Sequence, residues 1–118
     1  MSGSAGKMGG AEMKEGLKSS LLNKVKVTDK FWQGYQELVI DTVIPYQEKI
    51  LNDEIPGVEK SHALANFRIA AGLEEGEFYG MVFQDSDVAK WIEAAAYSLK
   101  WHPDKALEKQ IDETIDLI

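Results

Sequence analysis

Three polar side chains stand where a glycine-containing loop passes into a strongly helical segment: Gln84, Asp85 and Asp87. A helix amino terminus gathers polar groups at the rim of a pocket, and amide and carboxylate groups there can hydrogen-bond the hydroxyl groups of a sugar. We therefore take these three residues as candidates for substrate binding. The alternative is structural: Asp85 or Ser86 caps the helix, and Asp87 pairs with Lys90 one turn on. The residue types alone leave both interpretations open.

Other titratable residues offer weaker candidates. Glu74, Glu75 and Glu77 lie in the preceding loop, and glycosidases use two carboxyl groups held roughly 5 to 10 Å apart. Their clustering is more typical of a solvated surface. The two histidines, His62 and His102, are not at metal-ligand spacing, and no third ligand accompanies them. We predict no catalytic residue and no metal site in this chain.

Aromatic and amide side chains are the remaining candidates. Trp32, Trp91 and Trp101 are large enough to stack on a sugar ring. Trp91 falls on an apolar helical stripe and is predicted to lie in the core, whereas the sequence does not decide between the two roles for Trp32 and Trp101. Asn66 stands among small residues on a short helix. It can face either a pocket or a backbone carbonyl.

Composition excludes several classes of function. The 118 residues are 44% hydrophobic, which suits one globular domain or part of one, and the formal charge is −7 with no cluster of Lys or Arg. We therefore expect no nucleic acid partner. No apolar run is long enough to span a membrane, and no secretory signal is recognisable, so we expect a cytoplasmic protein without membrane contact. The absence of cysteine excludes disulfides and thiolate chemistry within these residues.

The elements that must position the candidates are helical. Residues 1–20 are rich in glycine and serine and are predicted to be a flexible leader, and residues 21–118 form the folded part, opening with a short extended segment. A first helix is expected from Lys30, capped by Thr28 or Asp29. Pro45 should kink or split it, because proline disfavours a helical conformation at Ile44. Its predicted buried face has three- and four-residue spacing: Phe31, Tyr35, Leu38, Val39, Val43, Tyr46 and Ile50.

Three further segments complete the expected fold. A short helix over residues 62–71 should end at Gly72, followed by an irregular loop to Asp85. A third helix should run to Trp101, with a buried stripe at Val88, Trp91, Ile92, Ala95, Ala96 and Leu99. After Pro103, a fourth helix should pack antiparallel to it through Leu107, Ile111, Thr114, Ile115 and Ile118. This last stripe ends without a glycine cap or a basic last turn, which we interpret as a truncation.

Five segments in this order resemble one known family. They are TDKFW at 28–32, VIPYQ at 43–47, NFRIAAG at 66–72, GEFYGMVFQDSDVAKWIEAAAY at 76–97 and HPD at 102–104. The stretch from Val25 to Ile118 is similar to the amino-terminal segment of the beta-L-arabinofuranosidases, glycoside hydrolase family 127. The long central segment is the most specific of the five.

The resemblance implies an all-α fold made of the first helices of an (α/α)6 barrel, preceded by a short extended segment. It also implies retaining hydrolysis of terminal beta-L-arabinofuranosyl units from arabino-oligosaccharides or glycoconjugates. In that family a cysteine thiolate held on zinc is the nucleophile, a glutamate supplies acid/base chemistry, and further cysteines and a glutamate bind the metal. None of those motifs occurs in this chain. Zinc is thus expected in the full-length family and no cofactor in this segment.

Three hypotheses follow. The first is a non-catalytic piece of a zinc-dependent hydrolase, which reaches its carbohydrate substrate through the full-length protein and exposes helix faces prone to self-association. The second is a free-standing helical interaction module, supported by globular size alone. The third is a small enzyme that uses its own carboxylates, such as Asp85 or Asp87.

Overall fold

The computed structural model describes residues 25–118, so the predicted leader and residues 21–24 of the predicted extended segment lie outside it. Residues 25–29 have no regular secondary structure, and no β-strand occurs in the described part. The all-α prediction is confirmed. The helical segments are α2 (Lys30–Leu38), the π-helical η2 (Val39–Val43), α3 (Ile44–Leu51), α4 (Ala63–Ala70), α5 (Gln84–Leu99) and α6 (Lys105–Leu117).

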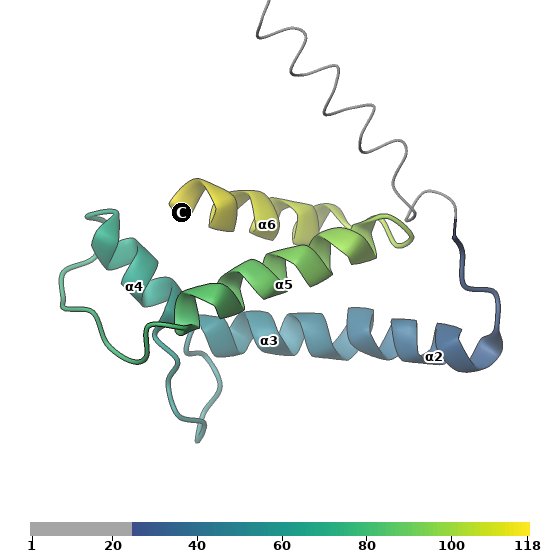
Figure 1. Cartoon of the computed structure of the whole chain (residues 1–118), viewed down its shortest axis with the longest axis horizontal. Coiled ribbons are helices and arrows are strands. Elements are labelled where there is room, and N and C mark those ends of the chain that lie inside the picture. Colours follow the sequence, from purple (N-terminus) through teal and green to yellow (C-terminus); the bar gives the residue numbers. More distant parts are fainter. Residues whose placement is uncertain (1–24) are drawn as a thin grey trace, which may run out of the picture.

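The first three segments form one continuous rod (Figure 1). It begins as predicted, because the Asp29 carboxylate accepts a hydrogen bond from the Trp32 backbone N–H at 3.0 Å. The predicted split lies in η2, where the Ile44 N–H bonds the Val39 carbonyl five residues back. Ile44 itself stays helical, with φ −61° and ψ −49°, although the proline that follows disfavours this conformation. The wider π turn relieves the clash between the Pro45 ring and the preceding turn.

The predicted buried face of this rod is the main error in the expected fold. Phe31 and Tyr35 are 62% and 52% exposed, and α2 contributes no buried residue. The rod enters the core through Ile44 and Leu51. The buried cluster is formed by residues of α3, α4, α5 and α6, so the apolar stripe of α2 stays exposed among residues 25–118. Periodicity marks an apolar stripe but not the element that covers it.

The core is organised around α5. Val88, Trp91 and Ala95 are buried along one side of this helix, as predicted, and Ile92 and Leu99 are half-buried. Ala96, which was predicted to be buried, is exposed. The Trp91 indole N–H also donates a hydrogen bond to the Ile44 carbonyl at 3.0 Å, tying α5 to α3. The rest of the buried apolar cluster comes from three helices: Ile44, Leu51, Ala63, Leu64, Leu107 and Ile111.

Helix α4 ends as predicted at Gly72, whose φ of +73° suits glycine. The Gly72 and Leu73 N–H groups bond the carbonyls of Ile69 and Arg68, at 3.0 and 2.9 Å. This pair of bonds satisfies the last carbonyls of the helix and turns the chain away from it. The following residues form the irregular loop that was predicted.

Helices α5 and α6 form the predicted hairpin (Figure 1). The second helix begins after Pro103 with Asp104 as its cap, and the Asp104 carboxylate accepts from the Leu107 N–H at 3.2 Å. Its stripe is buried at the start of the helix and exposed at the end. Leu107, Ile111 and Thr114 are buried, whereas Ile115 and Ile118 are 51% and 64% exposed.

Candidate functional site

The three predicted substrate-binding residues share the first turn of α5. The helix begins at Gln84, and Asp85 and Asp87 follow within that turn. Phe83 is the N-cap and makes no side-chain cap bond. The predicted cap at Asp85 or Ser86 is therefore wrong, because the backbone is already helical at Phe83, with φ −82° and ψ −7°. The Ser86 hydroxyl instead donates to the Phe83 carbonyl at 2.7 Å.

Gln84 supports the loop before the helix. Its side-chain oxygen accepts a hydrogen bond from the Met81 N–H at 3.1 Å. The side chain lies directly over Gly80, whose φ is +101°, and a β-carbon at Gly80 would collide with it. The amide of Gln84 therefore fixes the end of the loop while remaining half exposed at the surface.

Asp87 lies on the rim of a groove between α5 and the rod. This groove has a volume of about 390 Å³ and is walled mainly by apolar side chains, among them Val43, Ile50 and Trp91. The Lys90 ammonium, also on the rim, contacts the Asp87 carboxylate at 3.2 Å. The structural pairing proposed from the sequence is thus present. Gln84 and Asp85 do not line the groove, so the three candidates share a turn of helix but not one pocket.

Asn66 holds the loop in place, a role that the sequence left undecided. Its side chain is 7% exposed. The amide nitrogen donates to the Tyr79 carbonyl at 2.8 Å, and the amide oxygen accepts from the Tyr79 N–H at 3.1 Å. The His62 ring packs against the Tyr79 ring edge to face, with centroids 4.5 Å apart. These contacts pin the middle of the loop, so Asn66 faces backbone.

Two of the remaining titratable candidates, Glu74 and His62, make local contacts near the surface. Glu74 accepts from the Arg68 guanidinium at 2.9 Å, and its side chain is half exposed. His62 lies 3.8 Å from the Asp53 carboxylate, and the Asp53 side chain also accepts from the His62 backbone N–H at 3.0 Å. Both contacts are local and structural. Neither assembles a pair of carboxyl groups for hydrolysis.

One carboxyl group away from these candidates has a shifted pKa. Burial raises the pKa of Glu48 first, and the charge of Glu54 raises it further. Lys49 and a hydrogen bond from the Asn52 amide, 2.8 Å long, oppose the shift. The group lies on α3 and shares no groove with Asp87.

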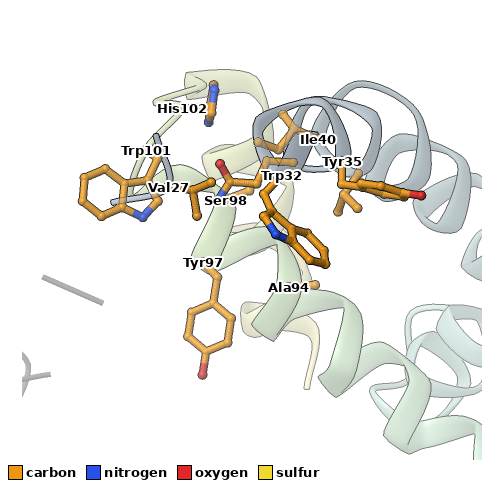
Figure 2. Close-up of a pocket in the computed structure, with 11 residues that line it drawn as sticks. Val27, Trp32, Tyr35, Ile40, Ala94, Tyr97, Ser98, Trp101 and His102 are labelled. Carbon is orange, nitrogen blue, oxygen red and sulfur yellow. The ribbon is translucent and has the colours of Figure 1, made fainter. Parts of the chain in front are cut away.

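A second groove joins the two tryptophans whose roles the sequence left open. It has a volume of about 420 Å³ and lies between α2 and the end of α5. Trp32 and Tyr35 enter it from α2, Tyr97 enters it from α5, and Trp101 follows that helix (Figure 2). The Tyr97 hydroxyl donates to Glu93 at 2.7 Å, and this bond raises the pKa of Tyr97. Sequence periodicity does not predict this groove, because its two sides are far apart in the chain.

The zinc ion implied by the resemblance does not fit these residues. The chain contains no cysteine. Among residues 25–118, no three His, Asp or Glu side chains are grouped closely enough to hold a metal. No helix in this part of the chain is long and apolar enough to cross a membrane.

The paired helices define a piece of an (α/α)6 barrel of the glycoside hydrolase type. Residues 24–118 match the family described as "Beta-L-arabinofuranosidase, GH127 catalytic domain", and the chain belongs to this family. It is 46% identical to a non-reducing end beta-L-arabinofuranosidase of Bifidobacterium longum subsp. longum, over 80% of this chain and 16% of that protein. The crystal structure of a GH127 beta-L-arabinofuranosidase from Geobacillus stearothermophilus T6 is also similar. Its TM-score is 0.77 at 59% identity, over 79% of this chain and 15% of that one.

The chain is much shorter than both relatives. It spans only 16% and 15% of the two relatives. The predicted family is confirmed. The 118 residues contain no cysteine, and residues 25–118 contain no grouped set of metal ligands.

Proposed function

We propose that this chain forms part of the helical catalytic domain of a retaining glycoside hydrolase that removes terminal beta-L-arabinofuranosyl units from arabino-oligosaccharides or glycoconjugates. One observation carries the proposal. The chain is 59% identical to a solved GH127 beta-L-arabinofuranosidase and shares its fold with a TM-score of 0.77. Identity at this level over most of the chain supports a shared role in the domain.

Within that domain the chain contributes wall and support, not reacting groups. We assign substrate contacts to the first turn of α5, through Gln84, Asp85 and Asp87. Asp85 is exposed, and Asp87 lies on a groove rim. Carboxylate oxygens at a helix amino terminus can accept hydrogen bonds from sugar hydroxyls. The loop before the helix is held in place by hydrogen bonds from Asn66 and to Gln84, and it would keep this turn in one position.

Catalysis requires groups that this chain lacks. In the full-length enzymes, a cysteine held on zinc would supply the thiolate nucleophile, and that cysteine would come from residues outside these 118. No reaction step is assigned to a residue of this chain. The 118-residue protein alone should therefore leave an aryl beta-L-arabinofuranoside unhydrolysed, even with zinc added.

A chimera tests the proposal directly. Residues 24–118 replace the matching segment of the Geobacillus stearothermophilus enzyme, and hydrolysis of an aryl beta-L-arabinofuranoside is measured. We expect kcat/KM within about tenfold of the parent enzyme, because the exchanged segments are 59% identical and share one fold. A chimera that folds and binds zinc but does not hydrolyse the substrate would overturn the proposal.

Single substitutions in the chimera then test the assigned contacts. Asp87→Ala should lower kcat/KM by up to about tenfold, the loss expected for one hydrogen bond to substrate. Lys90→Ala is the matched control, because it removes the same ion pair and keeps the carboxylate. If Lys90→Ala lowers kcat/KM as much as Asp87→Ala, then Asp87 serves only to pair with Lys90.

The exposed aromatic side chains weigh against the free-standing module. Phe31, Trp32 and Tyr35 are each more than half exposed and adjoin one another. A self-contained module covers its apolar helix faces. Size-exclusion chromatography and thermal melting separate the two hypotheses, since a module should be monomeric and melt in one sharp transition.

A further inference from the structure

The loop between α4 and α5 has few attachments of its own. Every residue from Leu73 to Phe83 is exposed, so no buried side chain holds this loop. From Glu74 to Gly80 the backbone forms no hydrogen bond with another backbone group among residues 25–118. Segments of this kind open at little cost in free energy. The position of the loop therefore depends on side chains that reach it from the neighbouring helices.

Asn66 on α4 provides the main attachment. Its amide group pairs with both backbone groups of Tyr79, accepting from the N–H at 3.1 Å and donating to the carbonyl at 2.8 Å. The side chain is 7% exposed, and hydrogen bonds are stronger in a buried site than in water. Ala63 and Leu64, on the same helix, belong to the buried cluster. Asn66 thus ties the middle of an exposed loop to the core.

A second attachment lies two residues further along the loop. The Met81 N–H donates to the Gln84 side-chain oxygen at 3.1 Å. Only Gly80 separates the two attachments, and its φ of +101° is a conformation that a β-carbon would strain. A shift of Tyr79 is therefore passed on to Met81 and to the Gln84 side chain.

The first turn of α5 needs this support. Its N-cap, Phe83, makes no side-chain hydrogen bond to the free N–H groups of the turn. A helix end without a side-chain cap frays more easily than a capped one. Gln84, Asp85 and Asp87, the residues assigned to substrate contacts, lie in this turn. The attachment at Gln84 therefore holds the turn from the loop side.

We propose that Asn66 is a positioning residue for substrate binding in the hydrolase. It acts through Tyr79 and Gln84 on the first turn of α5, and it does not contact the sugar, because both ends of its amide are bonded to Tyr79. The inference rests on the proposed function. Loss of the Asn66 amide should weaken the contacts made to the bound sugar, so it should raise KM more than it lowers kcat.

The kinetics of the chimera test this role. Asn66→Ala is made in the chimera that carries residues 24–118, and kcat and KM are measured on an aryl beta-L-arabinofuranoside. We expect kcat/KM to fall at least about tenfold, mainly through KM, since a misplacement of about 1 Å can cost on the order of a hundredfold. Thr114→Val is the matched control, because Thr114 is also a buried polar residue on a helix and donates to the Gln110 carbonyl at 2.8 Å. It lies outside the loop and should change kcat/KM by less than about twofold.

A double-variant cycle shows whether Asn66 acts through the first turn of α5. Asn66→Ala is combined with Asp87→Ala in the chimera. If both residues act through one turn, the loss in kcat/KM caused by Asn66→Ala should shrink at least about threefold once the Asp87 carboxylate is gone. Two losses that multiply independently would place the effect of Asn66 elsewhere and overturn the inference.

A second variant decides the question if Asn66→Ala impairs folding. Gly80→Ala strains the loop between its two attachments and brings a β-carbon against the Gln84 side chain, while the buried cluster keeps all its residues. Its circular dichroism and zinc content should match those of the unsubstituted chimera, and its KM should rise as in Asn66→Ala. An active chimera whose KM neither substitution changes would overturn the positioning role and leave the proposed function standing. An inactive chimera would overturn the proposed function, and this inference with it.

Discussion

Replacing Trp91 with phenylalanine tests how α5 is held to the rod. The side chain is 6% exposed, and its N–H bonds the Ile44 carbonyl at 3.0 Å. Trp91→Phe removes this donor, which costs about 0.5 to 1.5 kcal/mol. The smaller ring also loses buried apolar area and leaves space beside Ile44, which adds about 1 to 2 kcal/mol. We expect a loss of about 2 to 3 kcal/mol in the free energy of unfolding.

Trp32→Phe is the matched control, since the Trp32 side chain is 59% exposed. Its effect should stay within about 0.5 kcal/mol. Urea unfolding of the 118-residue chain, followed by far-ultraviolet circular dichroism, measures both. With a urea dependence of about 1 to 1.5 kcal/mol per molar for a chain of this size, Trp91→Phe should lower the midpoint by about 1.3 to 3 M. Equal shifts for the two variants would refute the central role given to Trp91.

Three further predictions use the same unfolding measurement. The raised pKa of Glu48 means that the folded state favours the protonated carboxyl. Protonation of Glu48 therefore contributes to the stability of the fold below its ordinary pKa of 4.5, and this contribution is lost as pH rises through the raised value. Glu48→Gln should therefore stabilise at pH 7 by roughly 0.5 kcal/mol or less, with no gain near pH 4. Gly34→Ala lies inside α2 with open space around it and should raise the free energy of unfolding by up to about 1 kcal/mol. Gly72→Ala places a side chain at φ +73° and should lower it by about 1 kcal/mol. Asp104→Ala removes the N-cap of α6 and should lower the free energy of unfolding by about 1 kcal/mol. Asp85→Ala removes no cap and should lower it by less than half as much. Equal losses would contradict the assigned caps.

The helices themselves were largely predictable from local patterns. Asp29 at the start of α2 and Gly72 after the end of α4 are recognisable in the sequence, because helix capping depends on residues close together in the chain. The start of α5 was misplaced because Phe83 adopts helical geometry without any side-chain signal. At the candidate site, the pairing of Asp87 with Lys90 follows the structural interpretation of the sequence. A backbone carbonyl was one of the two partners proposed for Asn66, but its identity could not be predicted, because Tyr79 lies beyond the end of α4.

The sequence by itself determined the all-α class, the family and the absence of thiolate chemistry, since these depend on residue types, local spacing and ordered segments. Only the tertiary structure decided which apolar stripe is covered. Trp91 reaches the Ile44 carbonyl across 47 positions, whereas Tyr35 stays half exposed despite equally regular spacing. Burial depends on which elements meet in space, and contacts between distant segments leave no local pattern in a single sequence.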